Sequence, residues 1–357
     1  MTETEHLLEA VVETGVSGAV VVADGRGDRV EAAAGVADAT TGEPLTPAHR
    51  FRIGSVTKVF VAPLVLRLVE EGSLDLDGDA APFAEDITIR QLLNHTSGLD
   101  DFMGDPIAFF EPYRNDLDHR WELDARGELE LVLQKPRLFQ PGHGWAYHGS
   151  NYIVLRLLVE KATGSSLRDA LRERILEPLG LERTDLVEGP LRGDCARGYL
   201  PPDNPILPGG PGIVDVTGID VPFHRAGGGI VSTAGEVAAL LRALLGGELL
   251  SEEMRTEMLD AVDSDWAETD RYGLGIGQIT ALMGRKRSSC GAAWGHLGFS
   301  LGYVAIALSS ENGERQVVIC ASGQPASEAA EGAFFDAAGE LAWHLFCARQ
   351  ASDHPKG

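Results

Sequence analysis

The segment that decides the fold runs from Phe51 to Gly72 and reads FRIGSVTKVFVAPLVLRLVEEG. Between Val56 and Glu71 its apolar residues recur at the spacing of an α-helix, and Gly72 suits the left-handed position that often follows a helix. The segment therefore predicts a buried helix, which Pro63 is expected to kink or destabilise because it lacks a backbone N–H group.

Ser55 and Lys58 lie three residues apart where this helix begins, so their side chains share one face. A serine hydroxyl is a weak nucleophile until a base removes its proton, and a lysine with a neutral amine can be that base. A helix N-terminus also favours negative charge that develops nearby. The pair predicts nucleophilic catalysis, with a helix-capping serine and a surface lysine as the alternative. Because Ser-x-x-Lys occurs about once by chance in a chain of this length, the pair alone does not decide between them.

Strand patterns lie on both sides of a mostly helical middle. Residues 17–23 and 29–37 predict an early hairpin, and residues 327–347 predict a final helix. Further strands are predicted at residues 272–279, 292–296, 301–309 and 316–321. Strands at both ends with helices between them indicate one sheet assembled from both ends of the chain.

We therefore predict an α+β fold and a single catalytic unit over residues 1–357. Residues 1–50 and 265–357 would form a lobe with an antiparallel sheet flanked by helices. Residues 51–264 would form an inserted, mainly helical lobe together with the loops of the site. The site is expected at the seam between the two lobes.

Composition limits the possible partners. The 357 residues include 30 basic and 54 acidic side chains, which gives a net charge of −24. Such a surface repels phosphate backbones and anionic lipids, so we expect neither nucleic acid nor membrane as a partner. The first residues, MTETEHLLEAVVETG, lack the basic start and apolar core of a secretory signal, which favours a cytoplasmic location.

The spacing of the four cysteines also favours a cytoplasmic location. They are far apart in sequence, and none belongs to a Cys-x-x-Cys pair. We therefore expect neither a disulfide framework nor a zinc site, and a reducing cytoplasm fits this pattern. The cysteines are Cys195, Cys290, Cys320 and Cys347.

Several motifs occur in an order that resembles a known family. The segment GSVTK at 54–58 and the segment LLNHTSGL at 92–99 resemble the serine β-lactamase and penicillin-recognising superfamily. The closer similarity is to its class C branch, with the related D,D-peptidases and esterases. The later motifs are Gln140–Tyr147, Asn151-Tyr152, Ala226–Thr233, Tyr272–Gly275 and Gly295–Phe299. The resemblance covers roughly residues 19–345, and it implies a β-lactamase/D,D-peptidase-like fold and an acyl-enzyme mechanism without metal or organic cofactor.

The resemblance also implies roles for individual residues. Ser55 would be the nucleophile, with Lys58 as its partner in the first motif. Tyr147 would act as a phenolate base or pass the proton to the leaving group. Which of Lys58 and Tyr147 is the general base stays open, and their titrations should be coupled.

The third motif of the family would correspond to His296 and Gly298, in the His-x-Gly variant. The backbone N–H groups of Ser55 and Phe299 would form the oxyanion hole. Local positive charge is expected from Lys58, with His296 as a further candidate for it.

The second motif departs from the family's Tyr-x-Asn, because Tyr147 is followed by His148 and Gly149. Shifting the register so that Asn151 supplies the amide would put Gly149 at the tyrosine position, so we reject that alignment. Gly149 cannot bind a substrate amide as the family's asparagine does. His148 is a candidate to compensate, with an ordinary hydrogen-bonded histidine as the alternative. The residues expected to bind substrate are Trp145, His148, Gly149 and Gly298.

The leading hypothesis is an esterase-like serine acyl hydrolase that acts on small ester or amide substrates through a Ser55 acyl-enzyme. The alternatives are a transacylase that forms amides or esters, a D,D-peptidase or β-lactamase, and a non-catalytic binding protein on this scaffold. The partner would be a small-molecule acyl substrate, while the oligomeric state is not set by the sequence. The aromatic segment 100–121 is expected to wall the pocket, with packing between lobes as the alternative.

Overall fold

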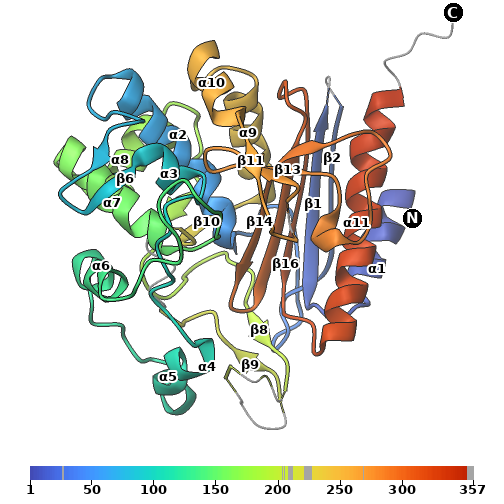
Figure 1. The fold of residues 1–357 in the computed structure, drawn as a ribbon. Helices are drawn as coiled ribbons and strands as arrows, with labels where there is room; N and C mark the ends of the chain where they lie inside the picture. Colours follow the sequence, from blue (N-terminus) through green and yellow to red (C-terminus); the bar gives the residue numbers. More distant parts are fainter. Residues whose placement is uncertain are drawn as a thin grey trace, which may run out of the picture.

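A nine-stranded antiparallel sheet forms the centre of the protein (Figure 1). The computed structural model describes residues 1–25, 28–202, 204, 206–207, 212–220, 227–267 and 269–351. In sheet order the strands are β11 (Val262–Asp263), β12 (Arg271–Tyr272), β13 (Gly277–Ile279), β14 (Ala293–Ser300), β15 (Tyr303–Ser309), β16 (Arg315–Ser322), β1 (Gly18–Gly25), β2 (Asp28–Asp38) and β3 (Glu43–Pro44). Because β1 pairs with β16, both ends of the chain build one sheet, which confirms the predicted fold class.

Helices cover both faces of this sheet, and the side chains of β1 show why. Successive residues of a strand point to opposite faces. Val20 and Val22 belong to the core on one face, and Val21 belongs to the core on the other. The helices α1 (Glu3–Val12) and α11 (Glu328–Ala351) pack on the Val21 face, whereas α9 (Ala234–Leu245) lies on the opposite face (Figure 1). The central strands β15, β16 and β1 are therefore an inner layer, buried on both sides.

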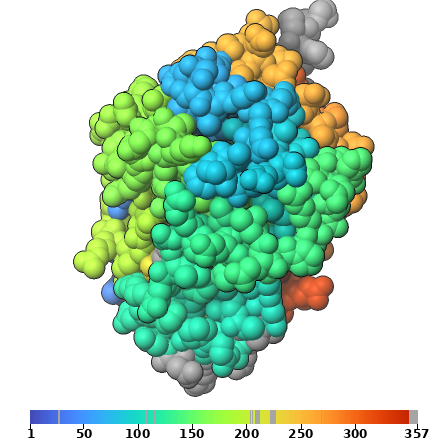
Figure 2. Space-filling model, turned by 60° about the vertical axis from the view of Figure 1, so that its left-hand side comes forward, coloured from blue at the N-terminus to red at the C-terminus, as the bar shows by residue number. Residues whose placement is uncertain are grey.

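The second lobe is mainly helical and lies beyond α9 in Figure 1, and Figure 2 shows its surface in blue to green. Its helices are α2 (Thr57–Glu70), α3 (Ile89–Leu93), α4 (Pro106–Phe109), α5 (Glu111–Asn115), α6 (Ala125–Leu133), α7 (Ser150–Thr163), α8 (Leu167–Leu171) and α10 (Glu252–Leu259), with the π-helical turn η2 (Arg172–Leu176). Short strands complete it: β4 (Phe51–Arg52), β5 (Asp79–Ala80), β6 (Ala84–Thr88), β7 (Asp185–Leu186), β8 (Tyr199–Leu200), β9 (Val214–Asp215) and β10 (Ile230–Ser232). No helix in the described part of the chain is both long and apolar enough to cross a membrane.

Two elements differ from the sequence predictions. The first helix of the site is preceded by a 3₁₀ turn, η1 (Gly54–Val56), and α2 then continues through Pro63 to Glu70. The strand predicted at residues 272–279 divides into β12 and β13. Between them the N–H group of Gly273 bonds to the carbonyl of Ile276, which makes a tight turn in place of an extended strand.

The expectation that the chain forms no disulfide is wrong, because Cys290 and Cys347 are bonded. The pair is 57 residues apart in sequence, so spacing gave no sign of it. The loop before β14 runs along α11, where the indole N–H of Trp343 donates to the carbonyl of Lys286 at 2.8 Å. This packing brings Cys290 beside the end of the helix. Cys195 and Cys320 are free.

Cys347→Ser should lower the free energy of unfolding by about 4 kcal/mol, because the bond restricts a long loop in the unfolded chain. Urea unfolding of the oxidised variant and the oxidised wild type measures the difference. Cys195→Ser, which removes a free thiol, should leave the value unchanged. Detection of four thiols in unreduced, denatured wild type would contradict the bond.

Candidate active site

Ser55 lies where the backbone of η1 touches strand β14. Gly54 has a φ of +51°, and a Cβ on it would lie 2.6 Å from the backbone nitrogen of Phe299. A Cβ on Gly298 would lie 1.9 Å from the carbonyl oxygen of Ile53. Only glycine fits at either position. The contact therefore brings the backbones of Ser55 and Phe299 to the same edge of the site, as an oxyanion hole requires.

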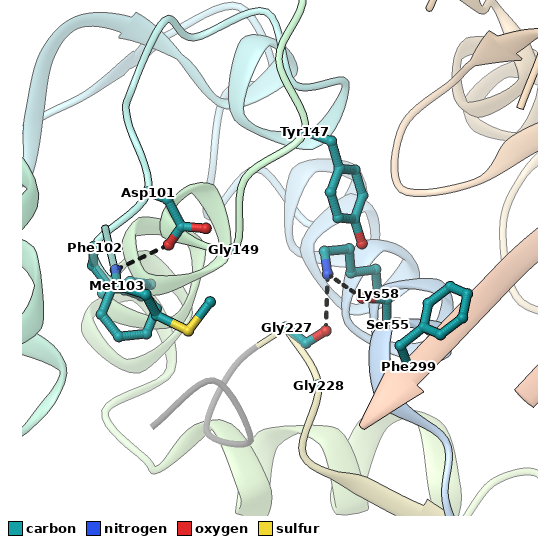
Figure 3. Close-up of a pocket in the computed structure, with 11 residues that line it drawn as sticks. Ser55, Lys58, Asp101, Phe102, Met103, Tyr147, Gly149, Gly227, Gly228 and Phe299 are labelled. Carbon is teal, nitrogen blue, oxygen red and sulfur yellow. Dashed lines mark hydrogen bonds between the residues drawn. The ribbon is translucent and has the colours of Figure 1, made fainter. Parts of the chain in front are cut away.

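Lys58 is buried one turn further along α2, with an exposed fraction of 2%. Its Nζ donates to Ser55 Oγ at 3.1 Å and to the carbonyl of Gly227 at 2.9 Å (Figure 3). The same Nζ lies 4.8 Å from the ring centroid of Tyr147. The serine, the lysine and the tyrosine named from sequence are thus brought together.

Tyr147 lies just before α7, and its hydroxyl points toward Lys58 and Ser55 (Figure 3). Trp266 stacks on its ring, with centroids 4.0 Å apart and an interplanar angle of 17°. The ring of His95 also packs against it at 4.4 Å. These contacts fix the orientation of the phenol. Sequence reasoning missed Trp266, because it lies in a loop without a motif.

His296 lies on β14 and is fully buried. Its Nδ1 bonds to the carbonyl oxygen of Leu297, so its Nε2 is the acceptor. The hydroxyl of Tyr272 donates to this Nε2 at 2.9 Å, and the hydroxyl of Tyr147 lies 3.5 Å from it. Burial and the charge of Lys58 lower the pKa of His296 to about 3, although the hydrogen bond to Leu297 acts in the opposite direction. His296 is therefore neutral, and the expectation that it is a local cation is wrong.

A pocket of about 250 Å³ opens beside Ser55 (Figure 3). Gly149 lines it, and a Cβ at this position would face open space. Neither Trp145 nor His148 is among the described residues that line it. Trp145 packs against Tyr272 at 5.9 Å, and His148 Nδ1 lies 3.7 Å from a carboxylate oxygen of Asp101. The lining residues are Ser55, Lys58, Asp101, Phe102, Met103, Tyr147, Gly149, Ile153, Gly227, Gly228 and Phe299.

The aromatic segment 100–121 contributes to the pocket wall and to the hydrophobic core. Phe102 lines the pocket, and it is preceded by Asp101 and followed by Met103 on the same wall. Phe110 and Tyr113 instead lie in the hydrophobic core of the helical lobe. Asp101 was missed from sequence, because a single carboxylate in an aromatic stretch carries no motif.

Asn151 does not replace the missing asparagine. It is fully buried on α7, where its Nδ2 lies 2.8 Å from Nδ1 of His95 and its Oδ1 accepts from Ser97 at 2.5 Å. His95 has a φ of +64°, so these bonds hold a left-handed turn against α7. Asn151 therefore supports the position of the 94–97 turn, and the register that leaves Gly149 in the third place of the motif agrees with this geometry.

The depressed pKa of His296 predicts that the protein becomes less stable as the pH is lowered. The native pKa is lower than the ordinary value near 6.5, so protons bind the unfolded chain more tightly, and stability is lost as pH drops through 6.5. Between pH 7 and pH 5 this group contributes a loss of about 2 kcal/mol. His296→Gln should reduce the fall in urea-derived unfolding free energy by that amount. The exposed control His6→Gln should keep the wild-type fall, and an undiminished fall in His296→Gln would refute the assignment.

Nearly the whole chain matches the model of one protein family. The model of the Beta-lactamase family matches residues 4–340. Esterase EstB of Burkholderia gladioli is 32% identical over 48% of this chain and 48% of its own. A D-aminopeptidase of Brucella anthropi is 31% identical over 48% of this chain and 34% of its own. The chain therefore spans half or less of these two curated relatives.

A solved structure matches nearly the whole length. The D-amino acid amidase of Ochrobactrum anthropi SV3, in complex with D-phenylalanine, has a TM-score of 0.81 and 26% identity and covers 98% of both chains. The family match, the order of the motifs and the convergence of Ser55, Lys58 and Tyr147 lead to one conclusion. This chain belongs to the Beta-lactamase family.

Proposed function

We propose that the protein is a serine acyl hydrolase that cleaves small esters and amides through an acyl-enzyme on Ser55. The observation that carries the proposal is the 3.1 Å contact between Lys58 Nζ and Ser55 Oγ at the wall of a pocket. A buried amine next to a serine at a helix start is the arrangement that activates such a nucleophile.

In the proposed mechanism Tyr147 carries the proton. Lys58 donates to two acceptors, Ser55 Oγ and the Gly227 carbonyl, which suits a charged ammonium. That charge stabilises the phenolate of Tyr147. The phenolate takes the proton of Ser55 as Oγ attacks the acyl carbon, and the resulting phenol gives the proton to the leaving oxygen or nitrogen. In the second half, Tyr147 takes a proton from water, the hydroxide attacks the acyl carbon, and the proton returns to Ser55.

His296 contributes as a neutral acceptor. Its Nε2 accepts from Tyr272 and lies 3.5 Å from the Tyr147 hydroxyl, so it orients the phenol of Tyr272 and borders Tyr147 without adding charge. The backbone N–H groups of Ser55 and Phe299 stabilise the oxyanion. The contact of Gly54 and Gly298 supports this role, since it holds the two backbones side by side.

The substrate class follows from Gly149. Other members of the family have an asparagine that binds a substrate amide at this position. In this chain the position is a glycine, and the space beside it is open. This supports simple acyl esters and amides as substrates and argues against β-lactams and D,D-peptides. The esterase and the D-aminopeptidase among the relatives support both bond types.

A fluorophosphonate probe should add one phosphonyl group to the wild-type protein, read out by intact mass. Ser55→Ala should abolish the adduct, whereas Ser73→Ala, an exposed serine at the other end of α2, should keep it. Tyr147→Phe should lower kcat/KM for p-nitrophenyl acetate by about 100-fold or more. An adduct that persists in Ser55→Ala would overturn the nucleophile, and near-normal turnover in Tyr147→Phe would transfer the role of base to Lys58.

Gly298→Ala should lower kcat/KM by about 100-fold, because its Cβ would push β14 away from η1 and misplace one oxyanion donor. Gly218→Ala is the matched control, since a Cβ on this exposed glycine meets no atom within 4 Å. Circular dichroism and thermal unfolding show whether Gly298→Ala is folded. A folded Gly298→Ala with wild-type turnover would contradict the oxyanion hole.

A further inference from the structure

The wall of the pocket that faces the catalytic group carries a carboxylate to which the mechanism gives no role. Asp101, Phe102 and Met103 stand on one side of the pocket, and Ser55, Lys58 and Phe299 stand on the other (Figure 3). Phe102 and Met103, which stand beside Asp101 on this wall, are apolar (Figure 3). An ionised group in such surroundings is costly unless it is hydrogen-bonded or paired.

Asp101 is held in its charged form by its neighbours. Burial raises the pKa of Asp101, but the neighbouring His148, the hydrogen bond from the backbone N–H of Met103 and the charge of Lys135 outweigh burial and hold the pKa below its ordinary value. The Met103 N–H donates to Oδ1 at 3.1 Å, and His148 lies 3.7 Å from Oδ2. Lys135 bonds to the backbone carbonyl of Asp101 instead of its carboxylate. The side chain is 28% exposed, so it can meet a ligand.

The glycine at 149 keeps the space beside this carboxylate open. A Cβ on Gly149 would meet no atom within 4 Å, and both residues line the same pocket. In the proposed mechanism Tyr147 protonates the leaving group, so the leaving group lies toward Tyr147. The acyl part then occupies the remainder of the cavity, between Ser55 and the wall that contains Asp101.

We propose that Asp101 binds a positively charged amino group on the acyl part of the substrate. The proposal rests on the proposed function and narrows its substrate class to esters and amides of amino acids and similar amino-carboxylic compounds. A charged hydrogen bond between an ammonium and a partly buried carboxylate is short and strong, whereas an uncharged isostere leaves the carboxylate desolvated without a partner. Lys58, the other charged residue that lines the pocket, lies on the opposite side (Figure 3).

The test compares two substrates of the same shape. Alanine p-nitroanilide carries an ammonium where isobutyryl p-nitroanilide carries a methyl group, and both enantiomers of alanine are used. At neutral pH the wild type should hydrolyse at least one alanine substrate with kcat/KM about tenfold or more above the isobutyryl substrate. Asp101→Asn should bring the two substrates within about threefold, because it lowers kcat/KM for the alanine substrate and removes the penalty on the isobutyryl substrate. The corresponding methyl esters, followed by pH-stat, give the same comparison if the anilides react slowly.

Asp118→Asn is the matched control, because it removes one negative charge from an exposed position and should keep the preference. Thermal unfolding and the fluorophosphonate adduct on Ser55 show whether Asp101→Asn is folded. The absence of a preference in the wild type, or its survival in Asp101→Asn, would overturn the proposal. In either case fluorophosphonate labelling shows whether Ser55 is a reactive nucleophile, as the proposed hydrolase function requires. A missing adduct would refute that function.

Discussion

The backbone contact between η1 and β14 is the constraint on which the site depends. Gly54 and Gly298 let the start of α2 lie directly against the strand, with no side chain between them. This contact joins the helical lobe, which carries Ser55 and Lys58, to the sheet, which carries His296 and Phe299. The position of β14 in turn depends on its ladder with β15 and β16, and β16 is fixed by β1 from the other end of the chain. Pairing between the two ends of the chain therefore sets the geometry of a reaction centre far from both.

The electrostatics of the site follow from burial around a single ammonium. Both His95 and His296 are fully buried, and burial together with the charge of Lys58 lowers the pKa of each ring. Neutral imidazoles leave Lys58 as the cation closest to Tyr147 among the described residues of the site. A phenolate beside one ammonium is stabilised, while the rings packed against it orient it without changing that charge. The rings of Trp266 and His95 thus orient the phenol of Tyr147 without adding a second charge to that of Lys58.

The strands and the motif residues could be predicted from sequence because their signals are local. The runs at residues 17–23 and 316–321 are continuous and apolar, as strands buried on both faces are. The motifs at Ser55, Tyr147 and His296 are recognisable by type and order. Tyr272 also lay within a recognised motif, so its place beside His296 had a signal that was not used. By contrast, Trp266 and the Cys290–Cys347 bond depend on which distant segments pack together, and no short window of sequence records that. The turn at Gly273 is a similar case, because the apolar run masked it.

Gly149 and Asp101 together change what the pocket can recognise. An asparagine at position 149 would offer one donor and one acceptor to a neutral amide, and it would fill the space that is open here. Without it, the strongest polar feature on the wall opposite Ser55 is an ionised carboxylate among apolar side chains. A neutral substrate removes water from the carboxylate without forming an ion pair with it, so the cost of desolvation is not compensated. A cationic substrate compensates for this cost by pairing with the carboxylate. Selectivity in this pocket therefore comes from the penalty on uncharged acyl groups as much as from attraction to charged ones, which is how a cavity with a single charge discriminates between molecules of the same shape.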